Sequence, residues 1–280
     1  MGDFGKGAGG GAPLSIADMA EYSWDAGLCA KVGLSEPSYA LCREVLENSA
    51  VLLRNNGILP LLQKKVLVIG GLANETYATG EPSFLDVLAM KKTEFDYAQG
   101  YDDGRRFGAK KLLLEAVEKA RRAGTVIVLC DGKRAELIES ICEVNNNVVV
   151  VLYGECPTET TVPFSERVSA VLWIAGGFEA TGTSVYDLLF GYANPSGKNA
   201  EGYGLSYTTF ELRHESVEGA TARVELVNTG SLAGKEVVRC YVDGELGCYA
   251  KVALRPNESN IVRFELNAEA VADKKITIKI

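Results

Sequence analysis

Three glutamates follow apolar, strand-like runs of this sequence, where a carboxyl group could act as an acid, a base or a ligand for a polar substrate. Glu155 comes directly after the run at 147–154. Ligands of open α/β sheets bind beyond the carboxyl ends of such strands, so Glu155 is the better candidate for a polar group in a pocket. Glu136 and Glu139 lie in a short predicted helix, 133–143. Acidic side chains in the first turns of a helix ordinarily stabilise it and stay solvated, whereas a catalytic acid must be desolvated.

Histidine, cysteine and nucleotide chemistry have little support. The only histidine is His214, which leaves no basis for Ser-His-Asp or Cys-His catalysis. The seven cysteines contain no C-x-x-C and no histidine at metal-ligand spacing, so we expect buried, reduced thiols and no metal site. The pairs Gly70-Gly71 and Gly176-Gly177 belong to no phosphate-binding motif and fit tight turns instead. No cofactor is expected.

The amino-acid composition limits which molecules this protein can bind and in which cellular compartment it is expected. The formal net charge is −8 and the isoelectric point is about 5.0, which argues against a nucleic-acid partner or an anionic membrane surface. No apolar run reaches the 18 residues or so that a spanning helix needs. Residues 1–34 are predicted to be a flexible leader, because their first part is rich in glycine and lacks the apolar core of a secretory signal. The prediction is a cytoplasmic protein.

The first half of the chain alternates between predicted strands and helices. A helix is predicted to begin near Ser35 and to use Leu52 and Leu53 in its apolar face, with Gly57 as its stop. Continuous apolar runs are typical of strands buried on both faces of a parallel sheet. The pattern predicts an α/β fold, an open, mostly parallel sheet with helices on both faces, with strands at 66–70, 125–130, 147–154 and 168–176 and helices at 106–123, 133–143 and 179–190.

After Tyr207 the pattern changes to short stretches that alternate apolar and polar residues, separated by turn signals such as Asp243-Gly244. Such alternation predicts an all-β, fibronectin type III-like sandwich of about seven antiparallel strands. The predicted organisation is therefore a leader over 1–34, an α/β domain over 35–201 and a β-sandwich over 202–280. Tyr203, Tyr207 and Phe210 are predicted to pack between the two domains.

Three stretches resemble the C-terminal half of family 3 glycoside hydrolases. Residues 188–210, LLFGYANPSGKNAEGYGLSYTTF, are similar to two consecutive signatures of that family, and 47–61 are similar to the entry into its C-terminal α/β domain. Residues 224–242, VELVNTGSLAGKEVVRCYV, are similar to part of its fibronectin type III-like domain. The resemblance covers about residues 40–280 and implies the same fold that the patterns predict.

The resemblance implies retaining glycosidase chemistry, but it leaves that chemistry incomplete on this chain. In this family an Asp nucleophile lies on a (β/α)8 barrel, and a Glu on a loop of the α/β domain protonates the leaving oxygen. A barrel needs about 200–250 residues, so we expect the nucleophile not to be on this chain. The loops that would face a barrel are short, since Asp131–Arg134 runs directly into a helix and only 199–201 join the two signatures.

We therefore expect a non-catalytic or accessory relative of a family 3 β-glycosidase that acts through a barrel-bearing chain or another copy of itself. The alternative is one part of a working β-glucosidase, acting on a β-glycoside or oligosaccharide, with its barrel on another chain or missing from this one. A third hypothesis is a carbohydrate-binding module, which would need exposed aromatic side chains on one face of the sandwich.

Overall fold

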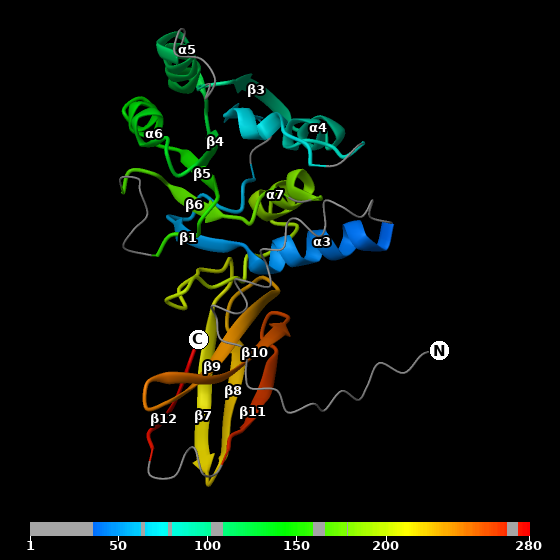
Figure 1. The fold of residues 1–280 in the computed structure, drawn as a ribbon, viewed down its shortest axis with the longest axis vertical. Helices are drawn as coiled ribbons and strands as arrows, with labels where there is room; N and C mark the ends of the chain where they lie inside the picture. Colours follow the sequence, from blue (N-terminus) through cyan, green and yellow to red (C-terminus); the bar gives the residue numbers. More distant parts are fainter. Residues whose placement is uncertain are drawn as a thin grey trace.

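The chain forms a mixed α/β domain followed by an all-β domain (Figure 1). None of the helices in the described part of the chain is long and apolar enough to cross a membrane. The predicted leader, 1–34, lies outside the described residues. A computed structural model describes residues 36–62, 65–77, 80–101, 109–158, 166–177, 179–267 and 274–280.

The first domain is built on a six-stranded sheet with strand order β1-β6-β5-β4-β2-β3. Neighbouring strands from β6 to β3 in this order are parallel, and β1 pairs antiparallel with β6 at one edge. This confirms the predicted open, mostly parallel sheet. The strands are β1 (Val51–Asn55), β2 (Lys65–Ile69), β3 (Glu94–Ala98), β4 (Val126–Asp131), β5 (Val148–Tyr153) and β6 (Ala170–Trp173).

Helices cover both faces of this sheet, as Figure 1 shows. On one face lie α5 (Ala109–Arg122) and α6 (Ala135–Cys142). The other face carries α3 (Glu36–Ser49), α4 (Phe84–Met90) and α7 (Thr181–Leu189), and a short 3₁₀ helix, η1 (Gly71–Asn74), follows β2. Because both faces are covered, every residue of β5 and β6 is buried, which explains their unbroken apolar sequences.

The structure corrects the predicted first helix. The helix ends at Ser49, and Val51–Asn55 forms β1 instead of a further helical turn. Val51, Leu52 and Leu53 are all buried, and three consecutive buried residues fit a strand between two helical layers better than one face of a helix. The prediction also omitted β3 and α4. Strand β3 is a half-exposed edge strand, and α4 has a capping box formed by Ser83 and Asp86 that the sequence does display.

The second domain consists of two three-stranded antiparallel sheets, which confirms its predicted all-β character. The strand orders are β10-β9-β12 and β11-β8-β7. Apolar side chains of both sheets meet in a core of their own, separate from that of the first domain. The described residues form six strands, not about seven: β7 (Phe210–Glu218), β8 (Thr221–Asn228), β9 (Gly234–Val242), β10 (Glu245–Leu254), β11 (Ser259–Glu265) and β12 (Ile276–Lys279).

Residues 203–207 connect the domains but pack with the first one. Tyr203, Leu205 and Tyr207 lie against the core of the α/β domain, whereas Phe210 packs against the core of the sandwich. Leu205 donates its backbone N–H to the carbonyl oxygen of Leu52 at 2.8 Å, which attaches the connection to strand β1. The connection is therefore built into the first domain rather than suspended between the two.

Two glycines allow the backbone to pack closely at this connection. A Cβ atom on Gly197 would lie 2.1 Å from the carbonyl oxygen of Ser49, at the end of α3. A Cβ atom on Gly204 would lie 2.2 Å from the carbonyl oxygen of Gly197. Both distances are far below van der Waals contact, and the opposing atoms belong to backbone that cannot rotate away. The segment 197–204 therefore requires glycine at both positions.

We predict that Gly197→Ala lowers the free energy of unfolding by about 2–4 kcal/mol, because the added methyl group overlaps backbone atoms at the domain junction. Gly71→Ala is the matched control, since a Cβ atom there meets nothing within 4 Å. It should change stability by less than about 0.5 kcal/mol. Urea unfolding of both variants measures the difference, and equal stabilities would contradict the close packing at Gly197.

Candidate functional site

Polar and aromatic side chains gather where the parallel strands of the first domain end. In an open α/β sheet the carboxyl ends of the strands lie at one edge, which is where ligands bind. The loops after β2, β3 and β4 and the last residues of β4 and β5 bring side chains to this edge. We call this set the sheet-edge cluster, and it consists of Glu75, Tyr77, Glu81, Tyr101, Asp131, Arg134 and Tyr153.

Tyr153 is the innermost member of the sheet-edge cluster. It ends β5, is directly opposite Asp131 of β4 in the sheet register, and is only 8% exposed. Burial raises the pKa of its hydroxyl well above the ordinary value, and the neighbouring Tyr77 and Glu75 raise it further. Burial likewise raises the pKa of Tyr77, whose hydroxyl donates to a carboxylate oxygen of Glu75 at 3.3 Å. Both phenols therefore stay protonated and able to donate hydrogen bonds at neutral pH.

A cation lies over an aromatic ring in the loops that follow β3 and β4. The guanidinium carbon of Arg134 is 4.1 Å from the centre of the Tyr101 ring, and its Nε atom lies 3.4 Å from a carboxylate oxygen of Asp131. The Tyr101 hydroxyl donates to the carbonyl oxygen of Leu129 in β4 at 3.2 Å. Planar stacking on Tyr101 together with the Asp131 carboxylate fixes the guanidinium at the edge of the sheet.

Glu81 holds two loops of this edge together rather than facing a substrate. One carboxylate oxygen accepts the backbone N–H of Ala180, at the start of α7, and the other accepts the backbone N–H of Tyr77 at 3.4 Å. Charge-assisted hydrogen bonds of this kind stabilise the ionised carboxylate. Glu81 is therefore a positioning group for the loop that carries Tyr77.

The three glutamates that sequence patterns singled out lie around this edge but outside the sheet-edge cluster. Glu155 lies two residues beyond Tyr153 and is exposed, and Glu136 is exposed in the first turn of α6. Glu139 is half-buried on the same helix, with a carboxylate oxygen 3.5 Å from a guanidinium nitrogen of Arg167. None of the three hydrogen bonds to another of them in the described part of the chain. Their functional roles stay predictions.

Sequence reasoning missed Glu75, Tyr77 and Tyr101 as site residues. Tyr101 follows β3, so recognising the alternating run EFDYA as a strand would have brought Tyr101 to the carboxyl edge. Glu75 and Tyr77 follow η1, and no residue spacing links them to Tyr101 or Tyr153. Their proximity arises only from the parallel strand order.

Metal ligands and reactive thiols are not part of this edge. The described residues contain no group of three or more His, Cys, Asp or Glu side chains that could hold a metal ion. His214 lies on β7 of the sandwich and is largely exposed. Burial raises the pKa of the Cys130 and Cys156 thiols to about 12, so they remain protonated and unreactive at neutral pH.

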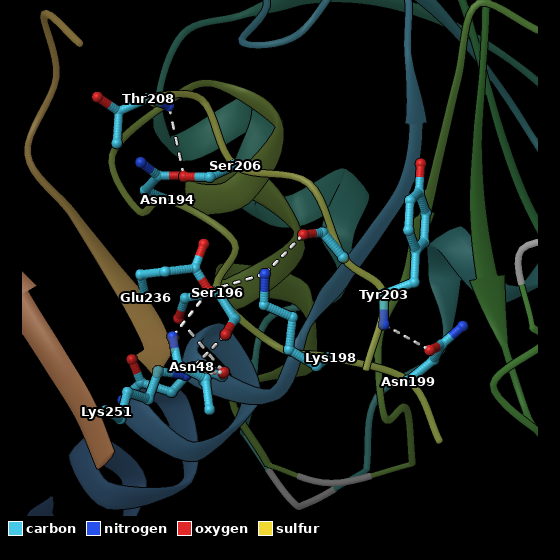
Figure 2. A network of polar contacts seen from close by, with 12 residues as sticks. Asn48, Asn194, Ser196, Lys198, Asn199, Tyr203, Ser206, Thr208, Glu236 and Lys251 are labelled. Atoms are coloured by element: carbon cyan, nitrogen blue, oxygen red, sulfur yellow. Dashed lines mark hydrogen bonds and ion pairs between the residues drawn. The ribbon is translucent and has the colours of Figure 1, made fainter. Parts of the chain in front are cut away.

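A second polar cluster lies at the junction of the two domains (Figure 2). The Lys198 ammonium is 2.7 Å from a carboxylate oxygen of Glu236, and both side chains are nearly inaccessible to solvent. Lys198 also donates to the carbonyl oxygen of Gly204 at 2.9 Å. Asn194 accepts hydrogen bonds from the Ser206 hydroxyl and the Tyr207 backbone N–H, each at 2.9 Å. The segment 188–210 thus uses its polar side chains to fix the connection between domains.

Two further lysines from the sandwich reach α3 at this junction. Lys235 donates to the side-chain oxygen of Asn48 at 2.7 Å. Lys251 donates to the carbonyl oxygens of Asn48 and Ser196 at 2.7 and 3.0 Å. Three lysines therefore gather at the junction, and one of them, Lys198, pairs with the buried carboxylate of Glu236. Burial, followed by repulsion from Lys235, lowers the pKa of Lys251 to about 8, although Glu236 opposes this effect.

Comparison with known proteins gives a consistent family assignment. The model of the glycosyl hydrolase family 3 C-terminal domain matches residues 50–206. Thermostable beta-glucosidase B of Acetivibrio thermocellus is 28% identical over 86% of this chain and 44% of its own length. An exo-alpha-(1->6)-L-arabinopyranosidase of Bifidobacterium breve is 25% identical over 81% of this chain and 43% of its own. The chain thus spans less than half the length of these relatives.

Solved structures show the same relationship. The GH3 beta-glucosidase of Bifidobacterium adolescentis superimposes with a TM-score of 0.73 and 25% identity, over 82% of this chain and 47% of that protein. The beta-glucosidase of Listeria innocua in complex with isofagomine superimposes with a TM-score of 0.72 and 22% identity, over 85% of this chain and 46% of that protein. In both cases this chain matches less than half of the larger protein.

We predict that stability of the domain junction increases with pH between about 8 and 10. The pKa of Lys251 is about 8 in the folded chain and is near 10.5 when unfolded, so the unfolded chain binds more protons in this window. Raising the pH from about 7.5 to 9.5 should therefore increase the free energy of unfolding relative to Lys251→Met, by less than the full pKa shift implies, because the side chain is exposed and solvent screens its charge.

The measurement is urea unfolding of the wild-type chain and Lys251→Met at several pH values. Lys274→Met, which removes an exposed lysine of the sandwich, serves as the control and should retain the wild-type profile. Parallel profiles for the wild-type chain and Lys251→Met would contradict a desolvated Lys251 ammonium.

Proposed function

This chain belongs to glycosyl hydrolase family 3 through its C-terminal domain, and from that membership we propose that it acts as the non-catalytic, accessory half of a β-glycosidase. In this proposal the sheet-edge cluster lines a pocket that holds a glycoside without cleaving it, and the chain acts by binding a protein partner. That partner is a barrel-bearing chain or a second copy of this chain.

The observation that carries the proposal is the environment of the carboxyl groups at the sheet edge. A retaining glycosidase needs two carboxyl groups about 5–5.5 Å apart, one of them kept protonated by desolvation. Glu136 and Glu155 are exposed, and Glu139 forms an ion pair with Arg167. The carboxylate of Glu81 is occupied by two backbone N–H groups. Glu75 is exposed and accepts from Tyr77, and Asp131 lies beside Arg134. None of these six described carboxyl groups is thus part of a desolvated pair of the kind that cleaves a glycoside.

The chemistry of the sheet-edge cluster fits a binding role. The protonated hydroxyl of Tyr153 can donate a hydrogen bond to a sugar oxygen, and the ring of Tyr101 adds apolar surface. The Tyr77 hydroxyl donates to Glu75 and can accept a hydrogen bond from a sugar hydroxyl. Arg134 is held in place by stacking on Tyr101 and adds further donors. Pockets for small ligands combine apolar surface with a few oriented polar groups in this way.

A second candidate function is one part of a working β-glucosidase, and the lengths of the relatives favour it. The alignment with thermostable beta-glucosidase B covers 86% of this chain but only 44% of the relative. The remaining length of such relatives is sufficient for a barrel of about 200–250 residues. The two candidates differ in whether a barrel joins this chain to complete an active site.

We predict that the purified chain alone does not hydrolyse 4-nitrophenyl β-glucoside, β-xyloside or α-arabinopyranoside, because the described carboxyl groups at the sheet edge form no acid–nucleophile pair. Release of 4-nitrophenol should stay at the rate of the blank, and light scattering of the same sample gives the mass in solution. No turnover by a monomer or dimer would support the accessory role. The panel includes three sugars because the similar proteins are named for different glycosides.

Carboxylate variants make this assay decisive. Turnover by the wild-type chain that is abolished in Glu155→Gln, Glu136→Gln or Glu139→Gln would mean that a complete site exists without a barrel, and the accessory role would be wrong. Turnover that appears only when a barrel-bearing protein is added would favour the second candidate.

A further inference from the structure

A groove of about 620 Å³ lies between the two domains. Its walls come from the end of α3, the loop after α7 and the end of β10. Small residues, among them Ala193, Ala233 and Ala253, leave its base open. The volume lies within the range of about 300–1,000 Å³ that is typical of small-molecule sites. We call it the junction groove.

One wall of the junction groove carries an exposed aromatic ring. Tyr192 is 69% exposed, which is unusual for a large aromatic residue, and its ring stacks at 5.8 Å on that of Tyr186 in α7. The Lys91 ammonium also lies 5.6 Å from the centre of the Tyr192 ring, and the rest of the ring surface remains accessible. Aromatic rings presented in this way provide an apolar platform for the flat face of a ligand.

The other walls of the junction groove carry as many cationic hydrogen-bond donors as carboxylate acceptors. Lys235 and Arg255 supply cationic donors, and Glu47 and Glu258 supply carboxylate acceptors, so the formal charges of the lining cancel. Asn48 adds an amide whose oxygen already accepts from Lys235, which leaves its N–H groups as donors. A charged ligand would meet as much repulsion as attraction in such a groove.

These features point to a neutral ligand with many hydroxyl groups. Each sugar hydroxyl both donates and accepts a hydrogen bond, so it can use a lining that offers cationic donors beside carboxylate acceptors. The apolar face of a sugar ring in turn fits an aromatic platform. We propose that the junction groove binds a saccharide, with Tyr192 as the stacking platform and the charged residues of the walls as hydroxyl partners.

This site is distinct from the glycoside pocket proposed at the sheet edge. The junction groove is formed entirely by described residues of both domains of this chain and needs no barrel. It would hold a saccharide without cleaving it. Failure of binding here would leave the accessory role untouched, and hydrolysis by the chain would not by itself affect the junction groove.

The test is titration of the isotope-labelled chain with cellobiose, followed by amide NMR shifts. We expect saturable shifts at Ala193, Gly234 and neighbouring groove residues, at least about tenfold weaker binding in Tyr192→Ala, and retained binding in Tyr192→Phe. Ile261→Ala, which removes another exposed apolar side chain on β11, is the control and should bind like the wild-type chain.

Glycerol serves as a polyol without a ring. Cellobiose shifts at the junction groove that disappear in Tyr192→Ala and are not produced by glycerol support the proposal. Absence of groove shifts, equal affinity in Tyr192→Ala, or equal shifts with glycerol would overturn it.

Discussion

The arrangement of the two domains depends on the buried ion pair between Lys198 and Glu236. The pair links the domains through the segment 197–204, whose backbone is closely packed. A buried ion pair adds little net stability, since desolvation of both charges offsets their attraction. Loss of one partner leaves the other buried and unpaired, which costs about 3–5 kcal/mol. An arrangement of the domains that separated the two side chains is therefore disfavoured. Gly197 and Gly204 have the same effect, since only glycine permits their backbone contacts.

The residues that carry the family resemblance hold the two domains together, and they are not the residues on which activity would depend. Segment 188–210 carries the strongest family resemblance, and its polar side chains are used at the domain junction rather than at a reacting bond. The sheet-edge cluster, in contrast, comes from loops that the rigid sheet positions but does not determine. A chain can thus retain the family's scaffold while the carboxyl groups at the sheet edge are exposed or already paired. Membership in the family supports the fold directly, whereas the accessory role is a proposal that rests on the environment of the sheet-edge carboxyl groups.

Much of the fold could be predicted because burial leaves a clear pattern in sequence. The runs that became β2, β4, β5 and β6 are continuously apolar, since helices cover both faces of the sheet. Strand β1 was mistaken for helix because Val51, Leu52 and Leu53 are apolar at spacings that either element can bury, and only pairing with β6 decides between them. Strand β3 was not predicted, because this edge strand is half exposed and carries charged residues that break the apolar pattern.

The site was less predictable than the fold. The position of Glu155 beyond β5 followed from strand order alone, but the contacts of Tyr77, Tyr101 and Arg134 depend on loops from three separate strands. No spacing within the sequence encodes such contacts. The same holds for the junction groove, whose walls combine residues from α3, from the loop after α7 and from the sandwich.

The central claim is that the accessory half carries no glycosidase nucleophile. Retaining glycosidases form a covalent glycosyl-enzyme intermediate, so an aziridine probe that mimics the sugar labels the nucleophilic carboxylate irreversibly. The most direct measurement is the intact mass of the purified chain after incubation with glucose- and xylose-configured aziridine probes. An unchanged mass is the predicted result. A single stoichiometric adduct, mapped by peptide sequencing to an Asp or Glu of this chain, would contradict the account.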